Sequence, residues 1–242
     1  MRTDFDPQAT KARMLREGLS WLAHGTLFGL GYIPPRHRPQ RRADIRTVVF
    51  VHGLAANRAC FFPMQAYLRT CGITRQYSFN YRLGRSIEQM AIELSRRLRR
   101  EIKGGRIDLV CHSMGGLIGR FYLQVLGGDR RVDRLITLAT PHYGSYASVY
   151  MPTRLVSQLA PDGPFLQYLN ELPPPRGVET TTIAGGRDLS VVPGQHALGP
   201  FGEHVLFPDL GHLDILMSPR VFRRVRRALA AHPAATVSNA SP

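Results

Sequence analysis

The chain of 242 residues is 43% hydrophobic and carries a formal net charge of +15. This length and composition fit one globular domain with its own core and exclude a disordered or fibrous chain. Nearly all the basic residues are arginines, which recognise phosphate groups, so an anionic membrane surface is a candidate partner. Because no nucleic-acid-binding motif accompanies the arginines, we expect solvated helix faces and no specific nucleic acid.

Residues 1–44 are expected to form an N-terminal amphipathic helical segment followed by a linker. The apolar part is too short and too interrupted to span a membrane, and the preceding Asp4 and Asp6 make a poor signal peptide. Two interpretations stay open: a helix packed on the domain, or an anchor at a membrane interface. Three cysteines give no disulfide framework, so we expect a cytoplasmic protein or one peripheral to a membrane.

Strands and helices alternate over residues 45–232, and a flexible tail is expected at 233–242. Continuous apolar runs predict buried strands, and apolar residues at helical spacing predict helices. The predicted strands are 47–51, 76–79, 106–111, 132–138, 178–184 and 203–207, and the predicted helices are 60–70, 86–103, 115–126 and 218–230. This order predicts an α/β fold with a mostly parallel, doubly wound sheet, whose ligand chemistry lies at the carboxyl ends of the strands.

The stretch from Val110 to Gly116 is the most informative part of the chain. It places Ser113 between a buried strand and a helix, on a sharp turn that exposes the hydroxyl at the positive end of the helix. This is the G-x-S-x-G nucleophile elbow with one departure, because Cys111 stands where the first glycine usually is. The alternative is an ordinary strand–helix turn with an incidental serine.

Two further strand ends carry an acid and a base, which gives the chain order Ser, Asp, His that is typical of one class of serine hydrolases. Asp188 follows strand 178–184, and His212 follows strand 203–207. We predict that His212 takes the proton of Ser113 and that Asp188 orients the imidazole. The backbone N–H groups of Leu54 and Met114 are the predicted oxyanion donors. For the acid, Asp209 and Asp214 lie too near His212 in the sequence, and Glu203 is a weaker alternative.

These motifs, together with Thr137 to Ser145, resemble the bacterial lipases and esterases of the α/β-hydrolase superfamily and the inositol-deacylase-like hydrolases. The resemblance covers about 46–230 and implies the triad Ser113, Asp188 and His212. It also implies a short lid insertion at about 144–176. The apolar side chains of this segment could wall a pocket for an acyl chain, or they could simply pack the insertion onto the domain. The residues predicted to bind substrate are His52, His142, Tyr143, Leu155, Leu159 and Phe165.

The expected function is that of a serine carboxylic-ester hydrolase, a lipase or esterase acting on small lipid-like esters through an acyl-enzyme. An acyltransferase or thioesterase using the same triad is the first alternative. A non-catalytic scaffold associated with lipid or membrane is the second. No cofactor is expected, and the histidines show no metal-ligand spacing, so no metal is expected either.

Overall fold

The computed structural model of this protein describes residues 22, 25, 29–32, 46–81, 84–150 and 155–230. The expectations for 1–44 therefore lie mostly outside the described residues, and the expected tail at 233–242 lies wholly outside them. Within the first of these segments, η1 (Gly29–Tyr32) is held to the domain. The carbonyl of Gly31 accepts hydrogen bonds from Arg58 and Asn80 at 3.0 and 3.1 Å. None of the helices described is long and apolar enough to cross a bilayer.

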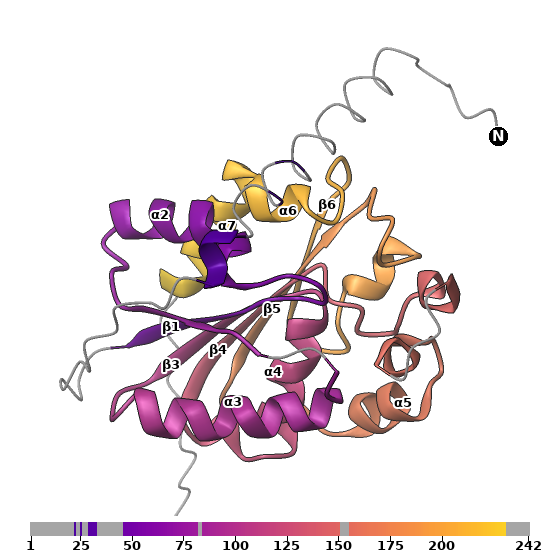
Figure 1. Ribbon diagram of the computed structural model, residues 1–242, viewed down its shortest axis with the longest axis horizontal. Helices are drawn as coiled ribbons and strands as arrows, with labels where there is room; N and C mark the ends of the chain where they lie inside the picture. Colours follow the sequence, from indigo (N-terminus) through magenta and orange to yellow (C-terminus); the bar gives the residue numbers. More distant parts are fainter. Residues whose placement is uncertain are drawn as a thin grey trace, which may run out of the picture.

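A parallel sheet of six strands forms the centre of the described structure (Figure 1). Its order is β2-β1-β3-β4-β5-β6, and every neighbouring pair is parallel. The strands are β1 (Thr47–Val51), β2 (Gln76–Phe79), β3 (Ile107–His112), β4 (Val132–Leu138), β5 (Glu179–Gly185) and β6 (Glu203–Phe207). The predicted α/β fold with a doubly wound parallel sheet is confirmed, and each predicted strand lies within one residue of its observed bounds.

Helices cover both faces of the sheet. Successive residues of the buried strands point to opposite faces and are apolar, so each face has to be covered. In Figure 1, α2 (Phe62–Thr70), α6 (Asp214–Met217) and α7 (Pro219–Ala230) lie above the sheet, and α3 (Ile87–Glu101) and α4 (Met114–Gln124) lie below it. Val49 and Leu109 pack in the core between the sheet and helices α3 and α4. Phe50 and Val110 pack in the core between the sheet and helices α2 and α7. Ser86 starts α3 with a capping box to Gln89.

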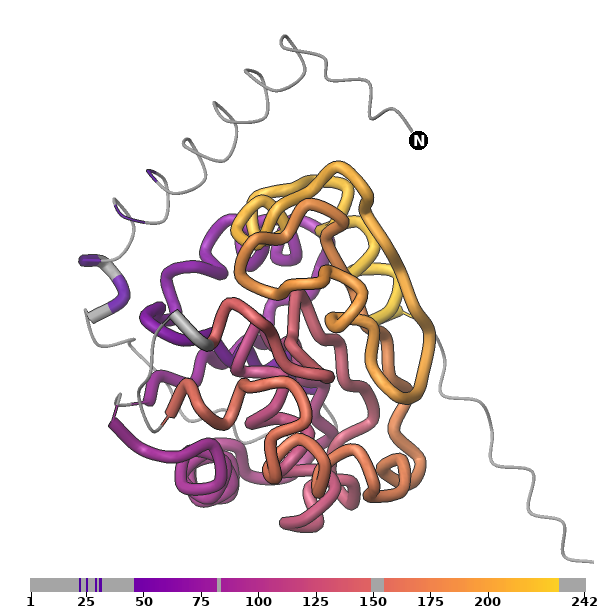
Figure 2. Tube along the Cα trace, turned by 90° about the vertical axis from the view of Figure 1, so that its right-hand side faces the viewer, coloured from indigo at the N-terminus to yellow at the C-terminus, as the bar shows by residue number. Residues whose placement is uncertain are grey.

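The chain between β4 and β5 makes short helices rather than another strand. They are η4 (Tyr146–Tyr150), η5 (Val156–Leu159) and α5 (Pro164–Glu171). We call residues 144–176 the insert, and its residues 151–154 lie outside the described part. Figure 2 views the molecule from the side on which the insert and the loops around β5 and β6 lie. Helix α5 packs against α4, the helix that begins directly after Ser113.

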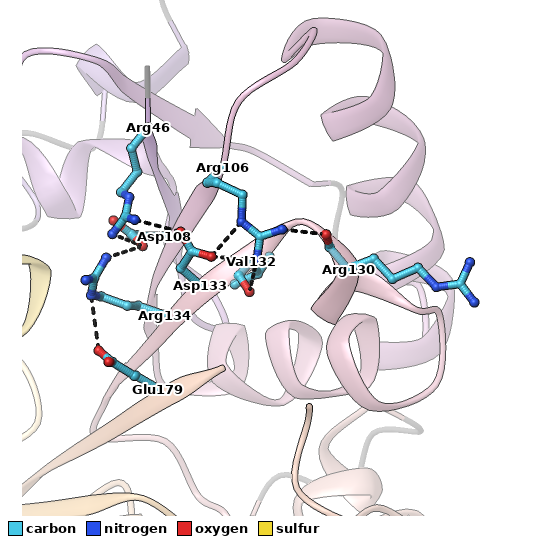
Figure 3. Close-up of polar contacts among 8 residues, drawn as sticks. All are labelled: Arg46, Arg106, Asp108, Arg130, Val132, Asp133, Arg134 and Glu179. Atoms are coloured by element: carbon cyan, nitrogen blue, oxygen red, sulfur yellow. Dashed lines mark hydrogen bonds and ion pairs between the residues drawn. The ribbon is translucent and has the colours of Figure 1, made fainter. Parts of the chain in front are cut away.

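A network of charged side chains lies at the amino ends of β1, β3, β4 and β5, away from the carboxyl ends where ligand chemistry is expected (Figure 3). Asp133 pairs with Arg46 at 2.7 Å and with Arg106 at 2.5 Å. Arg134, only 2% exposed, pairs with Asp108 at 3.2 Å and with Glu179 at 3.4 Å. Burial raises the pKa of Asp108 to about 7, and the charge of Arg46 only partly opposes this. The network ties four strands together at the end of the sheet that carries no predicted site.

Candidate active site

Ser113 occupies a strained turn between β3 and α4. Its φ of 53° and ψ of −130° lie where only glycine is comfortable. Such a conformation costs about 1–3 kcal/mol and persists where the surroundings enforce it. Here the enforcing contact is close packing of α4 on β1, because a Cβ on Gly115 would collide with the carbonyl oxygens of Val51 and His52. The strand–turn–helix geometry predicted for the elbow is present.

Cys111, which stands in place of the usual elbow glycine, has a defined site in the core. The residue is fully buried in the core on the α3 and α4 side. A Cβ placed on Gly119 of α4 would lie only 3.0 Å from Cys111 Sγ. The thiol therefore fills space that a glycine in the following helix leaves open. The close approach of β3 and α4 is therefore permitted by a glycine at position 119 of the helix, and not by a glycine at position 111 of the strand.

The predicted acid and base are in contact. Nδ1 of His212 lies 2.8 Å from Oδ2 of Asp188, so the ring donates to the carboxylate. The other oxygen, Oδ1, accepts 2.8 Å hydrogen bonds from the amides of Ser190 and Val191. Two backbone donors thus hold the Asp188 carboxylate in a fixed orientation. The arrangement leaves Nε2 of His212 as the nitrogen that can take a proton.

The competing acids are engaged elsewhere. Asp209 pairs with Arg220 at 2.8 Å, and both side chains are substantially exposed. Glu203 begins β6 at the opposite end of the strand from His212 and pairs with Arg224. Asp214 accepts a 3.0 Å hydrogen bond from the amide of Gly211, which shapes the loop that carries His212. Among the carboxylates considered, Asp188 is therefore the one in contact with the imidazole.

His112 links His212 to the elbow, a role that the sequence analysis did not predict. The two imidazole rings are 4.7 Å apart between centroids. Nε2 of His112 also lies 3.3 Å from the carbonyl oxygen of His212. Since His112 directly precedes Ser113, this contact places the base beside the elbow. The only sequence signal for it is its position at the carboxyl end of β3.

The loop that carries Leu54 lies against the serine. A Cβ on Gly53 would be only 2.8 Å from the Cβ of Ser113. Met114, which follows the serine in the chain, is the first residue of α4 and is fully buried. The two backbone amides predicted as oxyanion donors thus come from the residue that follows Ser113 and from the loop that contacts it.

The residues predicted to bind substrate lie in different environments. His52 is 1% exposed and stacks on Tyr81, with centroids 4.1 Å apart. Tyr143 is 40% exposed and packs edge-on against His196. Leu159 is buried in the core and Leu155 packs against that core.

Phe165 lines a cavity of about 580 Å³ between α3, α4 and the insert. The cavity is lined by Glu88, Phe121, Ser157, Gln158, Pro164, Phe165 and Tyr168. Of the six predicted residues, all of which the structure describes, Phe165 is the one that lines it. Phe121 follows Ser113 by eight positions, roughly 12 Å along α4, and the residues that line the cavity do not include Ser113, Asp188 or His212.

His142, another residue predicted to bind substrate, is enclosed by protein side chains in this structure. It is 1% exposed, with Nδ1 3.3 Å from Arg120 and Nε2 3.0 Å from the hydroxyl of Thr137. Burial, and then the charge of Arg120, hold the pKa of His142 well below its usual value. The ring is therefore neutral, and in this structure both nitrogens are occupied by protein partners.

Comparisons with known proteins relate this chain to one family and to several solved folds. Residues 47–172 match the sequence profile of a family described as palmitoyl protein thioesterase. A mature lipase from Bacillus licheniformis is 18% identical, with a TM-score of 0.61 over 81% of this chain and 98% of that chain. Lipase B from Aspergillus fumigatus is 14% identical, with a TM-score of 0.64 over 84% of this chain and 56% of that chain.

An enol-lactonase from Burkholderia xenovorans is 16% identical, with a TM-score of 0.60 over 79% of this chain and 94% of that chain. At these identities the solved structures establish a shared fold. No curated protein matches the sequence.

Proposed function

Because this chain belongs to the palmitoyl protein thioesterase family and is an α/β-hydrolase, we propose that it cleaves carboxylic esters through an acyl-enzyme on Ser113. The chain is a lipase-, esterase- or thioesterase-like hydrolase at the level of its family and fold. The observation that carries the finer proposal is the 2.8 Å hydrogen bond between His212 and Asp188, beside a serine held in a strained elbow.

In the proposed reaction Nε2 of His212 takes the proton of the Ser113 hydroxyl while Oγ attacks the acyl carbonyl carbon. The carbonyl oxygen becomes an oxyanion, and the N–H groups of Leu54 and Met114 donate to it. Collapse of this intermediate breaks the bond to the alcohol or thiol, which leaves with the proton from His212. Water then attacks the acyl-enzyme by the same steps and releases the acid. Asp188 stabilises the imidazolium in both halves and stays ionised.

The proposed substrates carry a lipid-like acyl group. Exposed apolar side chains on the loops after β4 and β5 support this proposal. Tyr146 is 57% exposed, and Leu189, which directly follows Asp188, is 67% exposed. Exposed arginines on α7, such as Arg223 and Arg226, would favour a substrate presented at an anionic membrane surface.

Replacement of the serine tests the proposal directly. Ser113→Ala should abolish turnover of p-nitrophenyl acyl esters and labelling by a fluorophosphonate probe. The matched control is Ser95→Ala, because Ser95 is a buried serine of α3 outside the site. Equal activity of the Ser113→Ala and wild-type proteins would contradict the proposal, whereas loss in Ser113→Ala alone supports it.

The thioesterase reaction is the second candidate, and the family match over residues 47–172 favours it. An ester and a thioester with the same acyl chain should be compared over a series of chain lengths. A higher kcat/KM on the thioesters would identify a thioesterase. Formation of a new ester when an alcohol is added would instead identify an acyltransferase. Measurements below and above the aggregation threshold of the esters would separate a lipase from an esterase.

A further inference from the structure

The loop after β1 is anchored by a buried tyrosine that follows β2. Tyr81 lies two residues beyond the end of β2 and is 8% exposed. Its hydroxyl lies 2.8 Å from the carbonyl oxygen of His52 and 2.9 Å from that of Gly53. Its ring stacks on the imidazole of His52 with an interplanar angle of 16°. Tyr81 therefore contacts the carbonyl oxygens of His52 and Gly53 and the imidazole of His52, all of which lie between β1 and Leu54.

The hydroxyl has a single proton, which the two carbonyl oxygens share, and its contact with the Gly53 carbonyl constrains the direction of an amide. The peptide unit that contains the Gly53 carbonyl also contains the Leu54 N–H, and a trans peptide is planar with the two groups pointing in opposite directions. The Gly53 carbonyl points at Tyr81, so the Leu54 N–H points away from Tyr81. A 2.9 Å contact from Nδ1 of His52 to the same carbonyl reinforces this orientation.

The anchored loop also touches the nucleophile. The Cα of Gly53 faces the side chain of Ser113 so closely that a Cβ there would lie 2.8 Å from Ser113 Cβ. A rotation of the Gly53–Leu54 peptide would therefore move the Leu54 N–H in the immediate neighbourhood of the reacting oxygen. Oxyanion donors contribute most when they are oriented before charge develops.

We propose that Tyr81 is a positioning residue that aims the Leu54 amide at the oxyanion. The inference rests on the proposed function, since it concerns the same acyl transfer. Tyr81 does not touch the reacting atoms and acts through the backbone of Gly53. Burial raises the pKa of Tyr81 well above its usual value, so the hydroxyl keeps its proton and remains a donor throughout the pH range of an assay.

Tyr77 provides a matched control for a test by mutation. It lies on β2, is also 8% exposed, and packs in the same core as Tyr81. Its hydroxyl interacts with Arg97 of α3. Tyr81→Phe and Tyr77→Phe each remove one buried hydroxyl and keep the ring. The two variants should therefore lose a similar amount of stability from the missing hydroxyl. Tyr81→Phe also removes the contact with the carbonyls of His52 and Gly53.

The test compares kcat and KM of both variants on an acyl ester and on the matched thionoester, in which sulfur replaces the carbonyl oxygen. Because sulfur is a poor acceptor, a thionoester gains little from oxyanion donors. Tyr81→Phe should lower kcat on the ester by about 10- to 100-fold with KM changed by less than about twofold, and should lower kcat on the thionoester much less. Tyr77→Phe should leave the ratio of the two rates as in the wild type.

The ester-to-thionoester ratio does not depend on how much of each variant is folded, so partial unfolding of Tyr81→Phe cannot imitate the result. An unchanged ratio in Tyr81→Phe would overturn the inference. If Ser113→Ala is inactive while the ratio is unchanged, the inference alone fails. If Ser113→Ala retains full turnover, the proposed function fails first. A ratio that falls in Tyr81→Phe and not in Tyr77→Phe supports both.

Discussion

Oδ1 of Asn170 in α5 accepts a 2.8 Å hydrogen bond from the guanidinium of Arg120 in α4. Arg120 is fully buried, and its other hydrogen-bond partners in the described part of the chain are also neutral. Burial lowers the pKa of Arg120 to about 10. The buried cation of Arg120 thus joins α4, which begins directly after Ser113, to α5 of the insert. None of these hydrogen bonds of Arg120 in the described residues goes to a carboxylate.

Arg120→Met should destabilise the protein by about 2–4 kcal/mol, because it leaves the Asn170 side chain and the Leu169 carbonyl without their donor. Urea titration measures this loss, and limited proteolysis should show earlier cleavage within 155–172. Arg96→Met is the control, since Arg96 is exposed on α3 and should change stability by less than about 0.5 kcal/mol. Equal midpoints for the two variants would show that Arg120 does not hold the insert.

Asp188→Asn should lower kcat by about 10³- to 10⁴-fold, because an amide cannot hold the required tautomer of His212 or stabilise its cation. Steady-state kinetics on a p-nitrophenyl ester measure the loss. Asp209→Asn is the matched control, since Asp209 lies three residues before His212 in the sequence and pairs with Arg220 at the surface. Comparable rates for Asp188→Asn and the wild type would remove Asp188 from the proposed triad.

Gly119→Ala should be less favourable in the wild type than in a Cys111→Gly background. A new Cβ at position 119 would stand 3.0 Å from Cys111 Sγ, whereas without the thiol it gains about 1 kcal/mol of helix propensity. A double-mutant cycle of unfolding free energies should therefore give a coupling of about 0.5–2 kcal/mol. Additive effects of the two substitutions would mean that the thiol and the helix glycine do not share space.

The buried carboxyl of Asp108 should make stability fall as pH rises. Burial raises its pKa from 3.8 to about 7 in the folded state, so the folded state binds more protons than the unfolded state between those values. The stabilisation is present below about pH 4 and is lost as pH rises through about 7.

Asp108→Asn should remove a decrease on the order of 1–4 kcal/mol across this window, measured by urea unfolding at several pH values. Asp209→Asn should retain the wild-type slope, since its carboxylate is exposed. Parallel pH profiles for the wild type and Asp108→Asn would contradict the assignment.

The fold could be predicted from the sequence because the buried strands are continuous apolar runs. The strand predicted at 132–138 has those bounds in the structure. The helix predicted at 86–103 begins at Ile87, just after the Ser86 cap, and ends at Glu101. These features depend on local sequence, which a single chain displays directly.

Only the part of the site that follows from the order of residues along the chain could be predicted from the sequence. The pairing of Asp188 with His212 follows from their places after β5 and β6, while their catalytic roles stay predictions. The anchoring by Tyr81 and the contact from His112 depend on how distant segments pack, and no local pattern signals them. The enclosure of His142 likewise has no local signal, because it comes from Arg120 in a different element.

The burial of the cysteines has a practical consequence. Cys60 and Cys111 are 1% and 0% exposed, and burial raises the pKa of both thiols, so neither presents a thiolate to an alkylating reagent. Cys71, at the end of α2, is partly accessible. A maleimide fluorophore should therefore attach to Cys71 alone in the native protein. That single label would sit on the helix layer opposite α4 and would report on conformation without touching the elbow.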